Sequence, residues 1–141
     1  MPRKNKLRDT GCPIAFALDT FGDRWSLIII RDMLMMGRQT YGEFLEGDEK
    51  IATNILADRL QELEALGIIT KQRDPENGRR VLYRLTKRGA DLAPIMLEIV
   101  QWSSKYDKNT KVKDRIVERI SKDRDAFVDE LRSRALDQST E

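Results

Sequence analysis

The sequence predicts a mainly helical chain that carries one small β-hairpin, which is an α+β fold. Two neighbouring segments support this fold class. Leu56, Leu60 and Leu63 follow an i, i+4, i+7 spacing, which is the apolar stripe of a helix, and Gly67 comes where such a helix would end. Residues 68–85 then read as two strands around Asn77-Gly78, a dipeptide that favours a tight type I′ turn. A helix that leads straight into a basic hairpin is the second half of a winged helix-turn-helix.

Composition limits the classes of function that are open to the chain. Its 141 residues suffice for one domain with appendages, and they include no histidine and one cysteine. A disulfide framework within one chain, a Cys/His metal site and histidine-based catalysis are therefore excluded. Because no nucleophile–base pair or phosphate loop is present either, we expect neither an enzyme nor a cofactor. The longest apolar run is too short for a membrane span and the basic start lacks a signal core, so we expect a cytoplasmic protein.

The chain divides into three parts by composition. Residues 1–11 are polar and basic without periodicity, and we expect a flexible basic arm. Residues 12–102 are expected to hold the winged helix-turn-helix domain with its dimer helices, and residues 103–141 a C-terminal helical extension. Pro13 is typical of a helix start, and Gly22 is expected to stop that first helix.

The next helix is expected to run from Asp23 or Arg24 to Met36. It is apolar nearly all round and carries methionines that suit packing, so it should be the centre of the core. Residues 38–40 can form a small third strand beside the hairpin. Thr40 and Glu43 then have the spacing of a capping box, which opens a short helix. This short helix, the turn at residues 46–49 and the leucine-striped helix form a helix-turn-helix unit.

The face of the striped helix opposite its leucines is small and polar, and it suits base edges. Asparagine and glutamine can each form two hydrogen bonds with adenine, and Asp58 could accept one from cytosine, although a solvated carboxylate is the simpler interpretation. Arg59 lies at the edge of the leucine arc, where we expect an ion pair with Glu62 or Glu43. The residues expected to face bases are Thr53, Asn54, Ala57, Asp58 and Gln61.

The hairpin is basic, and its charges suit DNA phosphates, which position a protein on a duplex. The net charge of +2 does not by itself indicate nucleic acid, so the argument depends on this local distribution. The second strand is expected to bury Val81, Tyr83 and Leu85 and to expose Arg84. The basic residues expected to contact backbone or minor groove are Lys71, Arg73, Arg79 and Arg80. The alternative is that the amphipathic helix and the charged hairpin bind nothing. Because the helix is followed directly by the hairpin, the combination favours binding to double-stranded DNA.

The helices after the hairpin carry more apolar surface than a small core can cover. Thr86 can cap one helix, whose start Pro94 delays or kinks, and a last helix is expected from about Lys113 to Ala135. The thin apolar stripe of this last helix should either dock on the body or pair with a second copy. Because uncovered apolar patches mark interfaces, we expect a homodimer held by the first helix, the helix after the hairpin and the last helix. Its expected interface residues are Ile14, Leu18, Ile95, Met96, Ile99, Val100 and Trp102.

The series of short motifs in this chain resembles the HxlR-type winged-helix transcriptional regulators. The motifs that carry the resemblance are Cys12-Pro13-Ile14, the run from Gly22 to Arg31, Tyr41-Gly42-Glu43-Phe44, the run from Ile51 to Gly67 and the run from Val81 to Gly89. The resemblance covers about residues 12–102 and implies a homodimer on a short palindromic operator. It also implies terminal helices as the dimer interface. Two features depart from it: Ala52 stands where many relatives have a serine cap, and the last helix is longer than usual.

Cys12 matches the position through which some members of the resembled family sense oxidants or electrophiles. Its place at a helix N-terminus favours a thiolate, and Arg8, or Arg24 if the second helix folds back, would act in the same direction. A small packed residue before a helix is the alternative. For the whole chain, two alternatives to a redox-responsive regulator are a MarR-like regulator with an unknown small-molecule effector and a winged helix used only for protein contacts.

Overall fold

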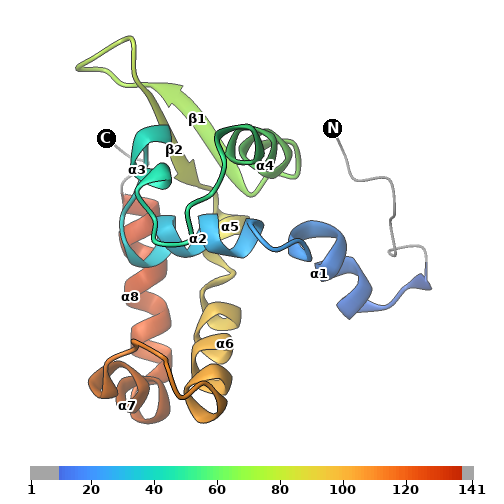
Figure 1. The fold of residues 1–141 in the computed structure, drawn as a ribbon, viewed down its shortest axis with the longest axis vertical. Coiled ribbons are helices and arrows are strands. Elements are labelled where there is room, and N and C mark those ends of the chain that lie inside the picture. The colour runs from blue at the N-terminus through green and yellow to red at the C-terminus, as the bar shows by residue number, and fades with distance from the viewer. Residues whose placement is uncertain (1–9, 138–141) are drawn as a thin grey trace.

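The computed structural model describes residues 10–137, so most of the expected basic arm lies outside the described residues. Figure 1 shows the hairpin and α4 at one end of the molecule and α7 at the other, with α1 projecting to one side. Within residues 10–137, no helix has the length and apolar character to cross a membrane. The elements are α1 (Pro13–Phe21), α2 (Ser26–Met35), α3 (Tyr41–Leu45), α4 (Thr53–Ala65), β1 (Ile69–Arg73), β2 (Val81–Leu85), α5 (Lys87–Ala90), α6 (Ala93–Tyr106), α7 (Asp114–Lys122) and α8 (Arg124–Asp137).

Helix α2 lies at the centre of the core, as its composition predicts, and packs against α6, α8 and β2. It starts slightly later than expected, at Ser26, and the Asp23 carboxylate before it accepts hydrogen bonds from the backbone N–H groups of Trp25 and Ser26. Met33 is buried in the core, whereas Met36 is 54% exposed and was wrongly expected to pack.

The helix-turn-helix unit forms as predicted. Thr40 and Glu43 make the capping box of α3 with both of its hydrogen bonds present. Ala52 is the N-cap of α4 and provides no side-chain bond, so this helix begins at Thr53. It ends at Ala65 with Leu66 as its C-cap, and Gly67 follows with a φ of +78°, a conformation that favours glycine.

The hairpin differs from its prediction in the turn. Neither Asn77 nor Gly78 has a positive φ, so the expected type I′ turn is wrong. The last strand pair is Arg73 with Val81, and residues 74–80 form a longer loop between them. The side chain of Asp74, which is buried, shapes this loop by accepting hydrogen bonds from the Glu76 N–H and from the Arg80 guanidinium.

The expected third strand is absent from the sheet, which within residues 10–137 has two strands. A single backbone hydrogen bond of 2.7 Å, from the Tyr83 N–H to the Gln39 carbonyl, is what joins residues 38–40 to β2. One hydrogen bond is too few to make residues 38–40 a strand of the sheet. The simple alternation expected for β2 is also wrong, because Leu82 and Arg84 are buried while Val81 and Tyr83 are half-buried. Helices lie against this strand from two directions, since both α2 and α8 contact it.

The segment after the hairpin forms two helices before the extension begins. Thr86 caps the short α5, and Pro94 lies in the first turn of α6, which agrees with the predicted cap and delayed start. Helix α6 continues to Tyr106, past the expected boundary at residue 103.

The single last helix that the stripe predicts is two helices. Asp123, with φ −138° and ψ 40°, breaks the chain between α7 and α8. Up to residue 137, the extension buries four apolar side chains, including Ile120 at 2% exposed and Leu131 at 1%, and others such as Ile116 and Leu136 are half-buried. Helix α8 packs against α2, α5, α6 and β2 of its own chain, so the extension docks on the body.

Candidate nucleic-acid interface

The face of α4 that was expected to meet bases is open to solvent. Thr53, Asn54, Ala57 and Gln61 are exposed and Asp58 is half-buried, while Leu56, Leu60 and Leu63 are buried on the opposite side. The structure therefore brings all five predicted reading residues onto one uncovered surface. Small and amide side chains on such a surface match the hydrogen-bonding edges of a DNA major groove.

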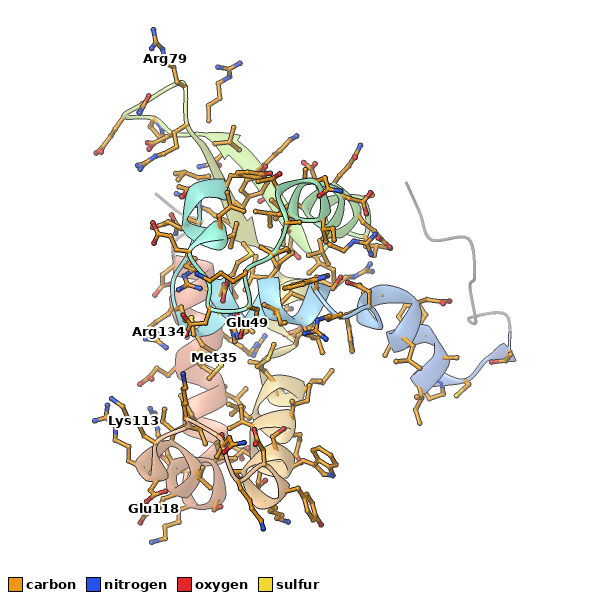
Figure 2. The ribbon with its side chains drawn as sticks, viewed as in Figure 1. Met35, Glu49, Arg79, Lys113, Glu118 and Arg134 are labelled. Atoms are coloured by element: carbon orange, nitrogen blue, oxygen red, sulfur yellow. The ribbon has the colours of Figure 1, made fainter. Side chains whose placement is uncertain are left out.

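The hairpin loop extends beyond the rest of the fold and carries Arg79 at its tip (Figure 2). Lys71, Arg73, Arg79 and Arg80 are all exposed. The Arg73 guanidinium donates a 2.9 Å hydrogen bond to the Gly78 carbonyl, which ties the strand to the loop. The loop thus presents cations on a braced support, which is the arrangement that phosphate contacts need.

Two of the hairpin arginines, Arg80 and Arg84, have structural roles that the sequence did not predict. Arg80 pairs with Asp74 at 2.6 Å, and hydrogen bonds from the Glu76 N–H and from Arg80 hold the pKa of Asp74 below its ordinary value. Arg84 is 7% exposed and lies inside the fold, so it does not add to the basic surface. Arg79 is exposed and has no ion pair among the described contacts, so its guanidinium is open to solvent.

A network of charged side chains fixes the turn between α3 and α4. The Arg31 guanidinium donates hydrogen bonds of 2.7 and 2.9 Å to the Glu49 carboxylate, and both Arg31 and Arg38 pair with the buried Asp32. The bonds from Arg31 lower the pKa of Glu49 to about 2. None of the five predicted base-facing residues belongs to this network, which ties the turn before α4 to α2 through Arg31 and Glu49.

Arg59 forms the ion pair with Glu62 that was predicted, at 3.0 Å. The alternative partner, Glu43, is instead the capping carboxylate of α3. Arg59 also approaches Asp23 at 3.6 Å and donates two hydrogen bonds to Asp58. Sequence reasoning missed these two partners, because one is distant along the chain and the other is an immediate neighbour, which on a helix normally faces elsewhere.

The residues expected at a dimer interface fall into two groups. Ile14, Leu18, Ile95, Ile99 and Trp102 are exposed large apolar side chains, and Val100 is half-buried. Met96, in contrast, is 5% exposed and packs in the core of its own chain, so it is not part of the open surface. The open surface includes two residues that were not predicted, Phe16 and Tyr106. Tyr106 lies four residues after Trp102, with ring centroids 5.3 Å apart, and that spacing was readable in the sequence.

Cys12 is exposed and is the N-cap residue of α1, without a side-chain capping bond. Its position at a helix N-terminus agrees with the prediction. The expected approach of Arg24 is wrong: Arg24 follows the opposite end of α1, where its guanidinium lies 5.5 Å from the centre of the Trp25 ring. Arg8 lies outside the described residues.

The comparisons with known proteins agree on one family. A sequence model of the HxlR-like helix-turn-helix family matches residues 20–111. The HTH-type transcriptional regulator YodB of Bacillus subtilis is 34% identical over 99 residues, which are 70% of this chain and 88% of YodB. The uncharacterized HTH-type transcriptional regulator YybR of the same organism is 33% identical over 112 residues, which are 74% of this chain and 89% of YybR.

Solved structures of winged helix-turn-helix regulators give the same result. The redox regulator HypR in its oxidized form has a TM-score of 0.60 at 32% identity, and the match covers 72% of this chain and 100% of HypR. The reduced form of YodB has a TM-score of 0.56 at 29% identity, over 71% of this chain and 98% of YodB. Helices α7 and α8 lie after the last residue of the family match, so the extension is additional to the shared domain.

Proposed function

Because this chain belongs to the HxlR-like helix-turn-helix family and is a winged-helix transcriptional regulator, we propose that it binds a palindromic operator as a homodimer. The observation that carries this proposal is the uncovered polar face of α4 beside the basic hairpin loop. In this arrangement α4 enters the major groove, and Arg79 grips the backbone or minor groove beside it.

The homodimer is supported by apolar surface that the protomer leaves open. Ile95, Ile99, Trp102 and Tyr106 follow i, i+4, i+7, i+11 spacing on one side of α6, and all four are exposed. None of the residues of α1 is buried. A second copy of the same chain is the partner that covers such surfaces in a closed two-fold assembly. A two-fold axis would place the two α4 helices about 34 Å apart, which is one turn of DNA.

Selection of binding sites from a random DNA pool tests the operator. We expect the selected sequence to be palindromic. The logarithm of the affinity for it should fall with the logarithm of the salt concentration, with a slope of about −0.9 for each phosphate contacted. Arg79→Ala should weaken binding to all sequences alike and make that slope shallower by about 1 for each arginine lost.

The matched control for Arg79→Ala is Arg115→Ala. Arg115 is an exposed arginine of α7, at the end of the molecule opposite the hairpin, so its removal should leave both affinity and slope unchanged. A chain that binds DNA without sequence preference and without salt dependence would refute the proposed function. A sequence-specific monomer would refute the palindrome alone.

We also propose that oxidation of Cys12 changes operator affinity. Support comes from the exposure of Cys12 at the start of α1 and from the similarity to HypR, whose structure is described as that of a redox regulator. With one cysteine in the chain, two Cys12 thiols can join across the dimer while a peroxide is reduced to water, or one thiol can take a small-thiol cap. A bridge between the α1 helices would change the spacing of the reading helices.

Thiol oxidation before DNA binding tests this second proposal. Oxidant should shift operator affinity in the natural chain and leave it unchanged in Cys12→Ser, while both proteins bind equally under reducing conditions. Mass spectrometry of the oxidized chain identifies a bridge or a cap. Equal affinity before and after full oxidation would leave Cys12 without a regulatory role.

A further inference from the structure

Arg59 lies where three carboxylates from two parts of the fold converge. Its Nη1 lies 3.0 Å from a carboxylate oxygen of Glu62 on α4 and 3.6 Å from one of Asp23, which precedes α2. Its Nε and Nη2 both donate to the same oxygen, Oδ2, of Asp58. The Arg59 side chain is 17% exposed. With its nitrogens engaged by acids, this arginine is poorly placed to contact DNA itself.

The Asp23 end of this group is firmly held. The Asp23 carboxylate accepts hydrogen bonds from Trp25 and Ser26 N–H groups at 2.9 and 3.0 Å, and also from the Ser26 hydroxyl. Burial opposes its charge, but these hydrogen bonds outweigh that effect and keep the pKa of Asp23 below its ordinary value. Asp23 also follows Gly22 directly, where an added Cβ would lie 2.3 Å from the Leu18 carbonyl oxygen, so the end of α1 has no room for a side chain at this position. Arg59 is therefore anchored to a rigid part of the body.

Asp58 is held in a different way, because one of its oxygens is left open. Its Oδ2 is occupied by Arg59, whereas no hydrogen bond to its Oδ1 is among the contacts of residues 10–137. The side chain is 46% exposed and lies on the reading face of α4. It lines an open groove of about 470 Å³ together with Trp25, Asn54 and Ile55. The free oxygen thus belongs to a carboxylate whose orientation is fixed from behind.

A bare carboxylate beside DNA is repelled by the phosphates, and this is why a solvated acid is the simpler interpretation of Asp58 from sequence. The contacts of Arg59 weaken that objection. The guanidinium offsets part of the negative charge of Asp58, and the two donated hydrogen bonds restrict its rotamers. What is left is one hydrogen-bond acceptor of fixed direction in the reading surface. In the major groove an acidic acceptor matches the N4 amino group of cytosine.

We propose that Arg59 is a positioning residue which holds Asp58 to accept a hydrogen bond from cytosine, so that this pair specifies one C·G base pair in each half-site. The proposal rests on the proposed function, because it assumes that α4 reads an operator. It assigns the reading contact to Asp58 and the orientation to Arg59. Asp23 and Glu62 keep Arg59 in place from the other side.

Binding-site selection with variant proteins tests the proposal position by position. The natural chain should enrich cytosine at one symmetric position of each half-site. Asp58→Asn should replace that preference with adenine or lose it, because asparagine pairs with adenine. Arg59→Gln should flatten the preference at the same position, by roughly 5- to 150-fold in relative affinity, and leave the other positions and the salt slope unchanged.

Arg59→Lys is the control for a folding defect. It keeps a positive charge near Glu62 and Asp23 but cannot donate the two hydrogen bonds that Arg59 gives to Asp58. It should fold with a melting temperature close to that of the natural chain and still show a weakened cytosine preference. An unchanged preference in both Arg59 variants would overturn the proposal, as would a uniform loss of affinity at every position. Selection of an operator that lacks an Asp58-dependent position would also overturn it while leaving the proposed function intact. Failure to select any operator would refute the proposed function itself.

Discussion

The first and last helices of the structure, α1 and α8, have opposite relations to the body. The sequence places apolar residues at helical spacing in both, and both were expected at a dimer interface. In the structure α8 buries Phe127, Leu131 and Ala135 against its own chain, while none of the residues of α1 is buried. The same local pattern thus leads to an internal helix in one case and to an open arm in the other.

The difference comes from what connects each helix to the body. Helix α7 and the break at Asp123 turn the chain back, so that α8 lies along α6 and reaches β2 (Figure 1). Helix α1 instead projects outward from the start of α2, beyond the short segment at residues 22–25, and none of its residues is buried (Figure 1). Periodicity in the sequence predicts that a helix has an apolar side, but the connecting segments determine which surface packs against that side.

Removal of a buried leucine from α8 should give the largest effect that separates the two helices. Leu131 is 1% exposed, so Leu131→Ala should lower the free energy of unfolding by about 2–5 kcal/mol. Leu18, in α1, is 47% exposed, and Leu18→Ala should cost less than about 1 kcal/mol when the chain is dilute enough to be monomeric. Chemical denaturation of both variants at low concentration makes the measurement. Equal costs would contradict the assignment of α1 as an open arm.

Loss of an aromatic side chain from the open surface should act on assembly instead of folding. Trp102 is 65% exposed in the protomer and pairs with Tyr106. If a second copy covers it, Trp102→Ala should weaken the dimer by about 2 kcal/mol or more, which is a 30-fold rise in its dissociation constant.

Sedimentation of Trp102→Ala over a concentration series measures that rise. The control is Met36→Ala, which removes an exposed apolar side chain, 54% exposed, from the end of α2 and should leave assembly unchanged. A dimer that tolerates Trp102→Ala would move the interface away from α6.

Features that depend on near neighbours could be predicted from the sequence. The Thr40–Glu43 capping box, the end of α4 just before Gly67 and the exposed polar face of α4 each follow from residues within one or two helical turns. These local features suffice to identify the winged helix and to place the five residues predicted to face bases on one surface.

Features that depend on distant partners could not be predicted in this way. The loop at Asn77-Gly78 is a local exception: the dipeptide has the composition of a tight turn, but the neighbouring buried carboxylate of Asp74 organises a longer loop around it. Arg84 and Met96 were expected on surfaces and are buried because α8 and the core cover them. The orientation of Asp58 depends on Arg59, which is held in turn by Asp23, a residue that precedes the core helix and is distant along the chain. No periodicity in the sequence encodes these contacts.

Acid should loosen the body on which α8 docks without a direct effect on α1. The pKa of Glu49 is lowered to about 2 by hydrogen bonds from Arg31. A carboxyl whose folded pKa is depressed contributes stability above its ordinary value of 4.5, and that stability is lost as the pH falls towards 2. Because the Glu49 side chain is 34% exposed, solvent screens the pair and the loss should be roughly 1 kcal/mol. The free energies of unfolding of the natural chain and of Glu49→Gln, measured between pH 5 and 2, should become equal at the acid end of this range. A difference that stays constant with pH would show that the acid-sensitive stability does not come from Glu49.

The smallest effect concerns the ion pair that seats α8 on the segment before α6. Arg132 and Asp91 are 2.7 Å apart, and their side chains are 32% and 52% exposed. An exposed pair contributes about 0–1 kcal/mol, so the coupling energy from Arg132→Ala, Asp91→Ala and the double variant should fall in that range. The single change Arg132→Ala should cost more than this coupling, because the Nε of Arg132 is buried and its aliphatic stem is removed together with the charge. Denaturation in high salt separates the two contributions, since salt screens the ion pair and leaves the packing of the stem intact. If the whole cost of Arg132→Ala disappeared in salt, charge and not apolar burial would hold α8 in place, and the contrast between α8 and α1 would need a different physical cause.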